Sequence, residues 1–435
     1  MKNSVPFKEF SKYSTLSVLG ILGVSCYILA DTFFIAKGMG TDGLTALNLA
    51  LPAYNFIHGI ALMLGMGGAT KFSVAKSRGQ NTDKIYTNTI YAAAAFSVIF
   101  MLIGFFLSEK LAALLGAEGN VLEMTSIYLK CLLLFSPAFI VNEILLCFVR
   151  NDSSPQLPMI AMLTGSFMNI LLDYIFIFPC DMGIFGAIFA TGLSPIISII
   201  LMLPHWIRKK NSFHLKISKP DFTLIGGEIS LGAPSFLAQF SSGIVMIVFN
   251  SLILVLEGNS GVAAYGVVAN IAFVVMAVFT GISQGIQPLL SRYHGVGNQK
   301  NLRTIFNYSV ITTIILSVVF YTILFVYAEP ITAVFNSEND LALQGIAVVG
   351  LKIYFISTVF SGLNTLISVF FTSIEKALPA QILSILRGLV LIIPITFLLA
   401  AIWQMSGIWL AYPITEILVA VLGVILYFKQ RNKTQ

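Results

Sequence analysis

Residues 158–178 read PMIAMLTGSFMNILLDYIFIF, a run that is mostly apolar and carries one charge, at Asp173. A helical run of about 20 apolar residues spans the roughly 30 Å hydrocarbon core of a lipid bilayer. Asn169 and Asp173 are four residues apart, so their side chains lie on one face of that helix. The stretch therefore predicts a membrane-spanning helix that carries a polar pair.

The same pattern recurs along the whole chain. Twelve apolar runs predict twelve membrane helices, at 13–36, 44–70, 85–107, 121–149, 158–178, 184–207, 228–256, 262–289, 304–327, 341–372, 378–401 and 407–428. Of the 435 residues, 57% are hydrophobic and 10% are charged, whereas soluble proteins are about a quarter charged. This composition excludes a cytosolic enzyme, a disordered scaffold and a secreted disulfide scaffold. We predict an all-α membrane protein.

Basic residues are distributed unequally among the loops between these runs. If the N-terminus is cytoplasmic, 20 of the 25 Lys and Arg residues lie in inner loops and only Lys37 and Lys110 lie in outer ones. Cytoplasmic loops of membrane proteins carry such an excess. We therefore expect both termini in the cytoplasm. The net charge of +6 reports this orientation, and we expect no nucleic-acid partner.

The second half of the chain repeats the first at a nearly constant offset. Residues 78–81 correspond to 296–299, and Leu-Pro at 157–158 corresponds to Leu-Pro at 378–379. Each half contains six predicted spans, so both halves enter the membrane from the same side. We expect two six-helix lobes related by a pseudo-two-fold axis along the membrane normal, with a cleft between them.

The repeat also predicts the domain organisation. The N-lobe comprises residues 1–207, a basic cytoplasmic linker comprises 208–227, and the C-lobe comprises 228–435. Two such lobes around a central cleft are typical of a carrier that works by alternating access.

Charged side chains inside the predicted spans are few. Each costs at least about 2.5 kcal/mol at a helix centre, so such residues mark function by default. Acids at span edges, such as Glu123 and Glu228, are set aside. The remaining charged residues are Asp31, Glu143, Asp173, Glu416, Lys130, Lys352 and Arg387.

Four polar residues of the N-lobe are predicted to lie at similar depth. Asp31 is roughly 27 Å and Asp173 roughly 22 Å from the inner face, at 1.5 Å per residue, while Asn169 shares the face of Asp173 and Thr191 lies in the outer half of its span. Two carboxylates, an amide oxygen and a hydroxyl suit a small hard cation, Na⁺ or H⁺. Alternatively, Asp31 and Asp173 are separately hydrogen-bonded between helices. Depth does not establish proximity, so convergence is a hypothesis.

The other intramembrane residues allow two interpretations each. Glu143, beside Asn142, either lines the cleft and attracts cationic substrate or is a partner for Lys130 or for a backbone group at the span end. Met66 and Met168 are either core residues or a soft, adaptable lining for varied hydrophobic ligands.

Two opposite charges occur in the C-lobe. Arg387 and Glu416 fall near mid-depth in neighbouring spans, which predicts an ion pair within that lobe or, alternatively, a proton relay. We find no Gly-rich phosphate loop, paired-histidine metal motif or nucleophile elbow in the sequence. We therefore expect a transporter driven by an ion gradient, with no enzymatic activity and no resident cofactor.

Several motifs resemble a known family. They are FVRNDSSP at 148–155, MNILLDYIFIF at 168–178, MGIFGA at 182–187 followed by Ala-Thr at 190–191, and ADTFFI at 30–35. Together they strongly resemble multidrug and toxic compound extrusion (MATE) transporters, and the resemblance covers essentially the whole chain.

This resemblance implies export of small cationic, amphipathic compounds by Na⁺ or H⁺ antiport. It also implies a protein of the bacterial cytoplasmic membrane, and we expect it to act as a monomer in the bilayer. The cation-binding positions of matching relatives fall on Asp31, Asn169, Asp173 and Thr191. Two alternatives remain: a lipid-linked saccharide flippase of a related branch, for which a basic cleft is expected, and a membrane receptor or enzyme.

Overall fold

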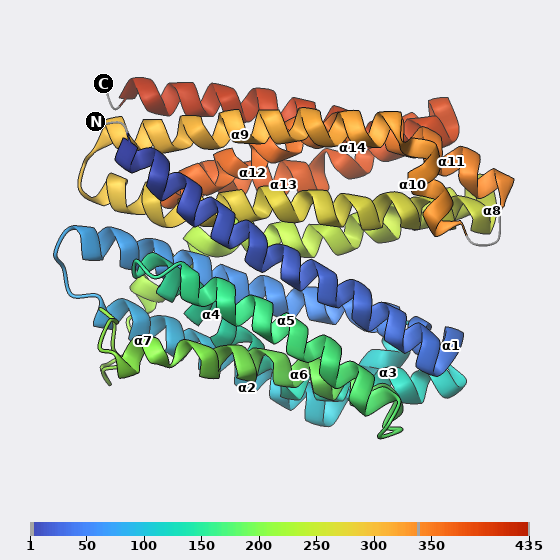
Figure 1. The fold of residues 1–435 in the computed structure, drawn as a ribbon, viewed down its shortest axis with the longest axis horizontal. Coiled ribbons are helices and arrows are strands. Elements are labelled where there is room, and N and C mark those ends of the chain that lie inside the picture. The colour runs from blue at the N-terminus through green and yellow to red at the C-terminus, as the bar shows by residue number, and fades with distance from the viewer. Residues whose placement is uncertain (1–3, 337–339, 434–435) are drawn as a thin grey trace. The chain divides into compact units, whose positions relative to one another are not determined.

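Helices account for nearly all of the chain that the computed structural model describes, residues 4–336 and 340–433, and no strand occurs within these ranges (Figure 1). The first half contains α1 (Ser4–Ser77), α2 (Asp83–Leu114), α3 (Gly119–Leu134), α4 (Ser136–Asn151), α5 (Gln156–Ile177), α6 (Gly183–Met202) and α7 (Pro204–Ile207). The second half contains α8 (Phe222–Gly295), α9 (Gln299–Val326), α10 (Ala328–Phe335), α11 (Leu341–Tyr354), the 3₁₀ turn η1 (Phe355–Ser357), α12 (Thr358–Ser373), α13 (Ala377–Ile385), the π-helical segment η2 (Leu386–Val390) and α14 (Ile392–Lys433). Lys2, one of the basic residues counted as cytoplasmic, lies outside the described residues.

Three of these helices each contain an interruption. Helices α1 and α8 have 74 residues each, and a straight helix of that length would extend roughly 110 Å. The backbone leaves helical geometry at Gly40 (φ 64°), at Gly258 (φ 62°) and, in α14, at Gln404 (φ 50°). Glycine adopts positive φ without steric penalty. Each of the three helices is therefore two spans joined by a tight turn.

The predicted spans all fall on helical segments. Helices α3 and α4 form one span that is bent by 48°, and up to nine helical elements of the described chain are long and apolar enough to cross a membrane. The interruptions at Gly40, Gly258 and Gln404 raise this number to twelve spans. The all-α, twelve-span prediction is confirmed.

The sequence repeat extends to the backbone. Residues with positive φ form pairs at the spacing of the sequence repeat, namely Gly40 with Gly258, Gly79 with Gly297, Ser153 with Glu375 and Gly183 with Gln404. Positive φ is uncommon, especially outside glycine. Equivalent turns of the two halves therefore share a residue with positive φ even where the residue types differ.

The described chain divides into two compact units. The N-terminal unit contains Thr15–Phe240 and Ser291–Asn298, and the C-terminal unit contains the described residues of Met1–Ser14, Ser241–Leu290 and Gln299–Gln435. The first part of α8 thus packs with the N-terminal unit. The division into an N-lobe at 1–207 and a C-lobe at 228–435 stays a prediction.

The linker between the halves is shorter than expected. Helix α8 begins at Phe222, because the Asp221 side chain accepts a hydrogen bond from the Leu224 amide at 3.0 Å and caps the helix. Residues 222–227, which we predicted as linker, are therefore helical. The remaining segment lies along α2, where the Lys216 amide donates to Thr87 Oγ1 at 3.0 Å and the Asp221 amide donates to Asn88 Oδ1 at 2.7 Å.

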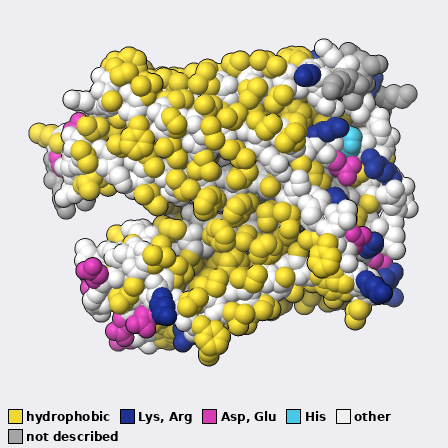
Figure 2. Space-filling view, turned by 180° about the vertical axis from the view of Figure 1, so that it is seen from behind, with side chains coloured by type: hydrophobic (Ala, Val, Ile, Leu, Met, Phe, Trp, Pro, Cys, Tyr) yellow, Lys and Arg dark blue, Asp and Glu magenta, His cyan; other side chains and the backbone are white. Residues whose placement is uncertain are grey.

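Apolar side chains cover the outer surface of the helices. Figure 2 shows hydrophobic side chains over most of the visible face and charged side chains gathered near the helix ends. Large hydrophobic side chains that are exposed in the described chain include Phe105, Phe106, Ile315 and Val318. An apolar surface of this extent faces lipid.

Candidate functional site

The four residues predicted to bind a cation lie together in the N-terminal unit. Asp31 comes from α1, Asn169 and Asp173 from α5, and Thr191 from α6. Their exposed fractions are 7%, 0%, 0% and 4%. Three helices thus contribute to one buried polar cluster, which we call the Asp31–Asp173 cluster.

Hydrogen bonds join three members of this cluster. In the amide orientation that satisfies both of its ends, Asn169 donates to Asp173 Oδ2 at 3.1 Å and accepts from the Thr191 amide at 3.3 Å. The Thr191 hydroxyl lies 3.4 Å from the Asn169 amide group and donates to the Ala187 carbonyl at 3.1 Å. Asn169 therefore links the carboxyl group of α5 to α6.

The carboxyl groups of the cluster retain free oxygen atoms. Oδ1 of Asp31 and Oδ1 of Asp173 are buried and have no hydrogen-bond partner within the described ranges. The charge of Asp31 acts on Asp173. Buried charge without a partner is costly, and like charges at short range disfavour double ionisation. A proton or an oxygen-ligated cation would relieve both effects.

Close helix packing positions the two carboxyl groups. A Cβ added at Gly23 of α1 would lie 2.6 Å from Leu163 Cδ2, and one added at Gly38 would lie 2.5 Å from Ile177 Cγ2. Small residues allow membrane helices to approach closely. These contacts, one on either side of Asp31 in the sequence, hold α1 against α5 and bring Asp31 near enough to Asp173 for their charges to interact.

Three tyrosines lie near enough to Asp31 to interact with its charge, and they were missed in the sequence analysis. The hydroxyl groups of Tyr27 and Tyr54 are 3.1 Å apart, and Tyr27, Tyr54 and Tyr128 all interact electrostatically with Asp31. Tyr27 lies one helical turn before Asp31, so its position was readable from the sequence. Tyr54 and Tyr128 come from segments distant in sequence, so no local sequence pattern indicates that they lie near Asp31.

The residues proposed to line a substrate cleft have different surroundings. Glu143 is buried, accepts a weak hydrogen bond from Cys147 Sγ at 3.9 Å and acts electrostatically on Tyr54. Asn142 Oδ1 is buried without a partner among the described residues. Met66 packs in the hydrophobic core, and Met168 is half-buried.

Glu143 does not pair with Lys130. In the described chain Lys130 is exposed, and its Nζ lies 5.8 Å from the centre of the Phe105 ring. The ion-pair interpretation of Glu143 is therefore wrong, because the Lys130 side chain faces the outer surface of the helix.

Arg387 and Glu416 contact each other in the C-terminal unit. Arg387 Nε lies 2.5 Å from Glu416 Oε1, and Asn364 Nδ2 donates to Glu416 Oε2 at 2.7 Å. Arg387 Nη1 also donates to Thr365 Oγ1 at 3.0 Å. Arg387 lies in the π-helical segment η2, a geometry that occurs often at functional sites. The buried Glu416 carboxylate is thus neutralised by Arg387 of the same unit.

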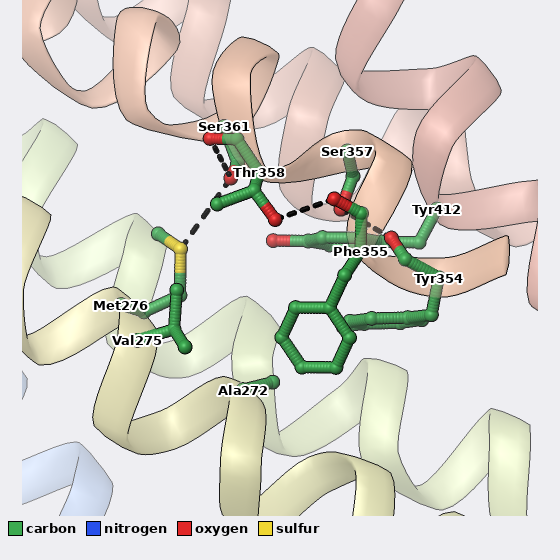
Figure 3. A pocket seen from close by; sticks show the side chains of 9 residues that line it. All are labelled: Ala272, Val275, Met276, Tyr354, Phe355, Ser357, Thr358, Ser361 and Tyr412. Atoms are coloured by element: carbon green, nitrogen blue, oxygen red, sulfur yellow. Dashed lines mark hydrogen bonds between the residues drawn. The ribbon is translucent and has the colours of Figure 1, made fainter. Parts of the chain in front are cut away.

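A small pocket of the C-terminal unit carries no charge. Its lining comes from α8, α11, η1, α12 and α14, and Figure 3 shows all nine residues: Ala272, Val275, Met276, Tyr354, Phe355, Ser357, Thr358, Ser361 and Tyr412. The rings of Tyr354 and Tyr412 stack with centroids 4.6 Å apart. The Ser357 and Thr358 hydroxyls donate to helix carbonyls. The pocket therefore lacks the charge that the Asp31–Asp173 cluster has.

Comparison with known protein families shows which family this chain belongs to. The family model described as MatE matches residues 17–175 and 234–398, one segment in each half of the repeat. The chain belongs to this family. The resemblance noted in the sequence, to multidrug and toxic compound extrusion transporters, is confirmed.

Relatives and solved structures agree with this assignment. The chain is 28% identical to the multidrug export protein MepA of Staphylococcus saprophyticus, covering 99% of this chain and 95% of that protein. It is 26% identical to MepA of Staphylococcus aureus, covering 99% and 96%. A solved outward-facing multidrug resistance MATE transporter has a TM-score of 0.92 at 21% identity, covering 99% and 96%. As a MatE member, the chain is a multi-pass membrane transporter.

Proposed function

We propose that this MatE protein exports small cationic, amphipathic compounds in exchange for Na⁺ or H⁺. The observation that supports this most strongly is the pair of buried carboxyl groups, Asp31 and Asp173, each with an oxygen atom that lacks a partner in the described chain. The multidrug export name of its MepA relatives is consistent with this role. The transporter works in a bacterial cytoplasmic membrane with both termini inside, as a monomer without a resident cofactor.

Charge neutralisation provides the coupling. When the cluster is empty of cations, its negative charge attracts a cationic substrate, and Glu143 adds to this attraction from α4. Na⁺ or H⁺ that enters from outside binds among Asp31, Asn169, Asp173 and Thr191 and removes that charge. Ion and substrate then compete for the same charge, so each weakens the binding of the other by the same factor.

The acidic character of the cluster separates this proposal from its alternative. A flippase for lipid-linked saccharides needs Arg or Lys side chains to hold pyrophosphate. The buried cluster of the N-terminal unit consists of carboxyl, amide and hydroxyl groups.

Transport by the reconstituted protein tests the proposal. Proteoliposomes loaded with a fluorescent cationic dye would be given an Na⁺ gradient or a pH gradient, each imposed alone. We expect one of the two gradients to drive dye movement and its collapse to stop that movement. Equal dye fluxes with and without both gradients would contradict ion-coupled export.

A further inference from the structure

Glu228 is a buried acid outside the Asp31–Asp173 cluster. The sequence placed it at a span edge together with Glu123, and Glu123 is indeed exposed. Glu228 has an exposed fraction of 0%. It lies six residues into α8, roughly 9 Å from the start of that helix, within the part of α8 that belongs to the N-terminal unit.

Direct backbone contact between α1 and α8 buries this side chain. A Cβ added at Gly67 of α1 would lie 1.9 Å from the Glu228 carbonyl oxygen, and one added at Gly232 of α8 would lie 1.8 Å from the Met63 carbonyl oxygen. The two backbones therefore touch within one helical turn of Glu228, at its own carbonyl and at Gly232, and no solvent reaches the Glu228 side chain.

Thr89 of α2 makes the only hydrogen bond of the Glu228 carboxyl group in the described chain. Thr89 Oγ1 lies 3.0 Å from Glu228 Oε2 and also 3.0 Å from the Ile85 carbonyl oxygen. A hydroxyl group has one proton to donate. If Glu228 is ionised, the Thr89 hydroxyl can donate its proton either to the Glu228 carboxylate or to the Ile85 carbonyl, and one of the two hydrogen bonds is lost. If Glu228 is protonated, it donates to Thr89, and Thr89 donates to Ile85, so both hydrogen bonds form.

The second oxygen atom of the Glu228 carboxyl group also favours the protonated state. Glu228 Oε1 is buried and has no partner among the residues described. An unpartnered oxygen is far less costly on a neutral acid than on a carboxylate.

Two charged groups act on Glu228, and neither forms an ion pair with it in the described chain. Lys71 of α1 attracts negative charge there and Asp221, which precedes α8, repels it. Lys71 Nζ lies at the backbone of the neighbouring residue, 2.3 Å from where a Cβ of Gly227 would be. Asp221 is itself paired with Lys84, with Nζ 2.7 Å from Oδ2.

We infer that Glu228 is a proton-binding site of this protein, separate from the Asp31–Asp173 cluster. The carboxyl group carries a proton while α1, α2 and α8 enclose it. When this packing opens to the cytoplasm, the O–H bond breaks, the proton passes to water, and the carboxylate that remains lies near Lys71. Proton binding stands on the geometry alone, whereas its use in transport rests on the proposed antiport.

Infrared difference spectroscopy on the purified full-length protein in nanodiscs tests the proton directly. At neutral pH we expect the wild-type spectrum to contain the carbonyl-stretch band of a protonated carboxylic acid. This band should be absent from the spectrum of Glu228→Gln. The band should persist in Glu123→Gln, the exposed control, and in Asp31→Asn and Asp173→Asn. A spectrum of Glu228→Gln that equals the wild-type spectrum in this region would overturn the inference.

Replacement of Thr89 provides a second, independent measurement. Thr89→Val removes the acceptor of the acid proton and should shift the band to the higher frequency of an acid without a hydrogen bond. Thr89→Ser keeps the hydroxyl group and should leave the band in place. An unshifted band in Thr89→Val would contradict the assigned contact.

Transport separates this inference from the proposed function. In proteoliposomes, we expect the wild-type dye flux to depend on the pH at the cytoplasmic face. Glu228→Gln mimics the protonated acid, so we expect its dye flux to lack this dependence. An unchanged dependence would remove the transport role of Glu228. If the wild-type protein itself shows no ion-coupled flux, the antiport proposal fails while the infrared result for Glu228 still holds.

Discussion

Arg387 Nε lies 2.5 Å from Glu416 Oε1, so the buried acid of the C-terminal unit has a cationic partner within its own unit. Asp31 and Asp173 in the N-terminal unit have no ion-pair partner among the described residues, and each keeps one buried oxygen without a hydrogen bond. The duplicated halves therefore differ in buried charge although their equivalent turns share residues with positive φ. Negative charge that is available for a cation is concentrated in the N-terminal unit.

The pair of Arg387 and Glu416 should contribute strongly to stability. Arg387→Met leaves the buried Glu416 carboxylate without its cation, and loss of one partner of a buried pair costs about 3–5 kcal/mol. We expect a lower unfolding temperature in detergent, measured by differential scanning fluorimetry. The double variant Arg387→Met with Glu416→Leu should recover most of the loss. A single variant as stable as the wild type would show that the pair has no structural role.

Removal of either acid of the Asp31–Asp173 cluster should abolish ion-coupled efflux. Asp31→Asn and Asp173→Asn keep the side-chain volume but cannot supply the negative charge that ion and substrate share. We expect dye efflux at the background of protein-free vesicles, with wild-type amounts of protein in the membrane. Glu109→Gln, at an exposed position, is a matched control that should pump normally. Wild-type efflux by both aspartate variants would place the coupling site elsewhere.

Features that are determined within a single helix were predictable from the sequence. Apolar length identified the spans, and the fixed helical rise placed Asp31 and Asp173 at similar depth. Glu228 was misjudged because its burial depends on the contact of α1 with α8 at Gly67 and Gly232, which no local pattern reveals. The electrostatic interaction of Tyr54 and Tyr128 with Asp31 was not predictable for the same reason, because it depends on the packing of segments that are distant in sequence.

Asp152, in the loop between α4 and α5, should make stability depend on pH. Burial alone would raise the pKa of its carboxyl group, but hydrogen bonds from His205, Lys76 and Ser212 hold that pKa below its usual value. A carboxyl group whose pKa is lower in the folded state stabilises the fold at neutral pH, and the contribution disappears as the pH falls through the range below about 4. We expect unfolding temperature to fall over this range.

Asp152→Asn should remove that dependence. Its unfolding temperature should lie below the wild-type value at pH 7 and converge with it under acid conditions. The linker should also become more sensitive to trypsin, because the Asp152 carboxylate accepts a 2.8 Å hydrogen bond from the Ser212 amide. Asp181→Asn, at an exposed position, serves as the control. Parallel pH profiles of Asp152→Asn and the wild type would show that other groups carry the effect.

The backbone contact at Gly67 should not tolerate a methyl group. Gly67→Ala places a Cβ 1.9 Å from the Glu228 carbonyl oxygen, so α1 and α8 must separate. Such overpacking typically costs about 1–3 kcal/mol, and it should admit water to Thr89. In a Thr89→Cys background, we expect Gly67→Ala to increase labelling by a maleimide added at the cytoplasmic face. Gly226→Ala is the matched control, because an added Cβ there has no heavy atom within 4 Å in the described chain. Equal labelling of Gly67→Ala and Gly226→Ala would mean that the α1–α8 contact does not seal Glu228 from water.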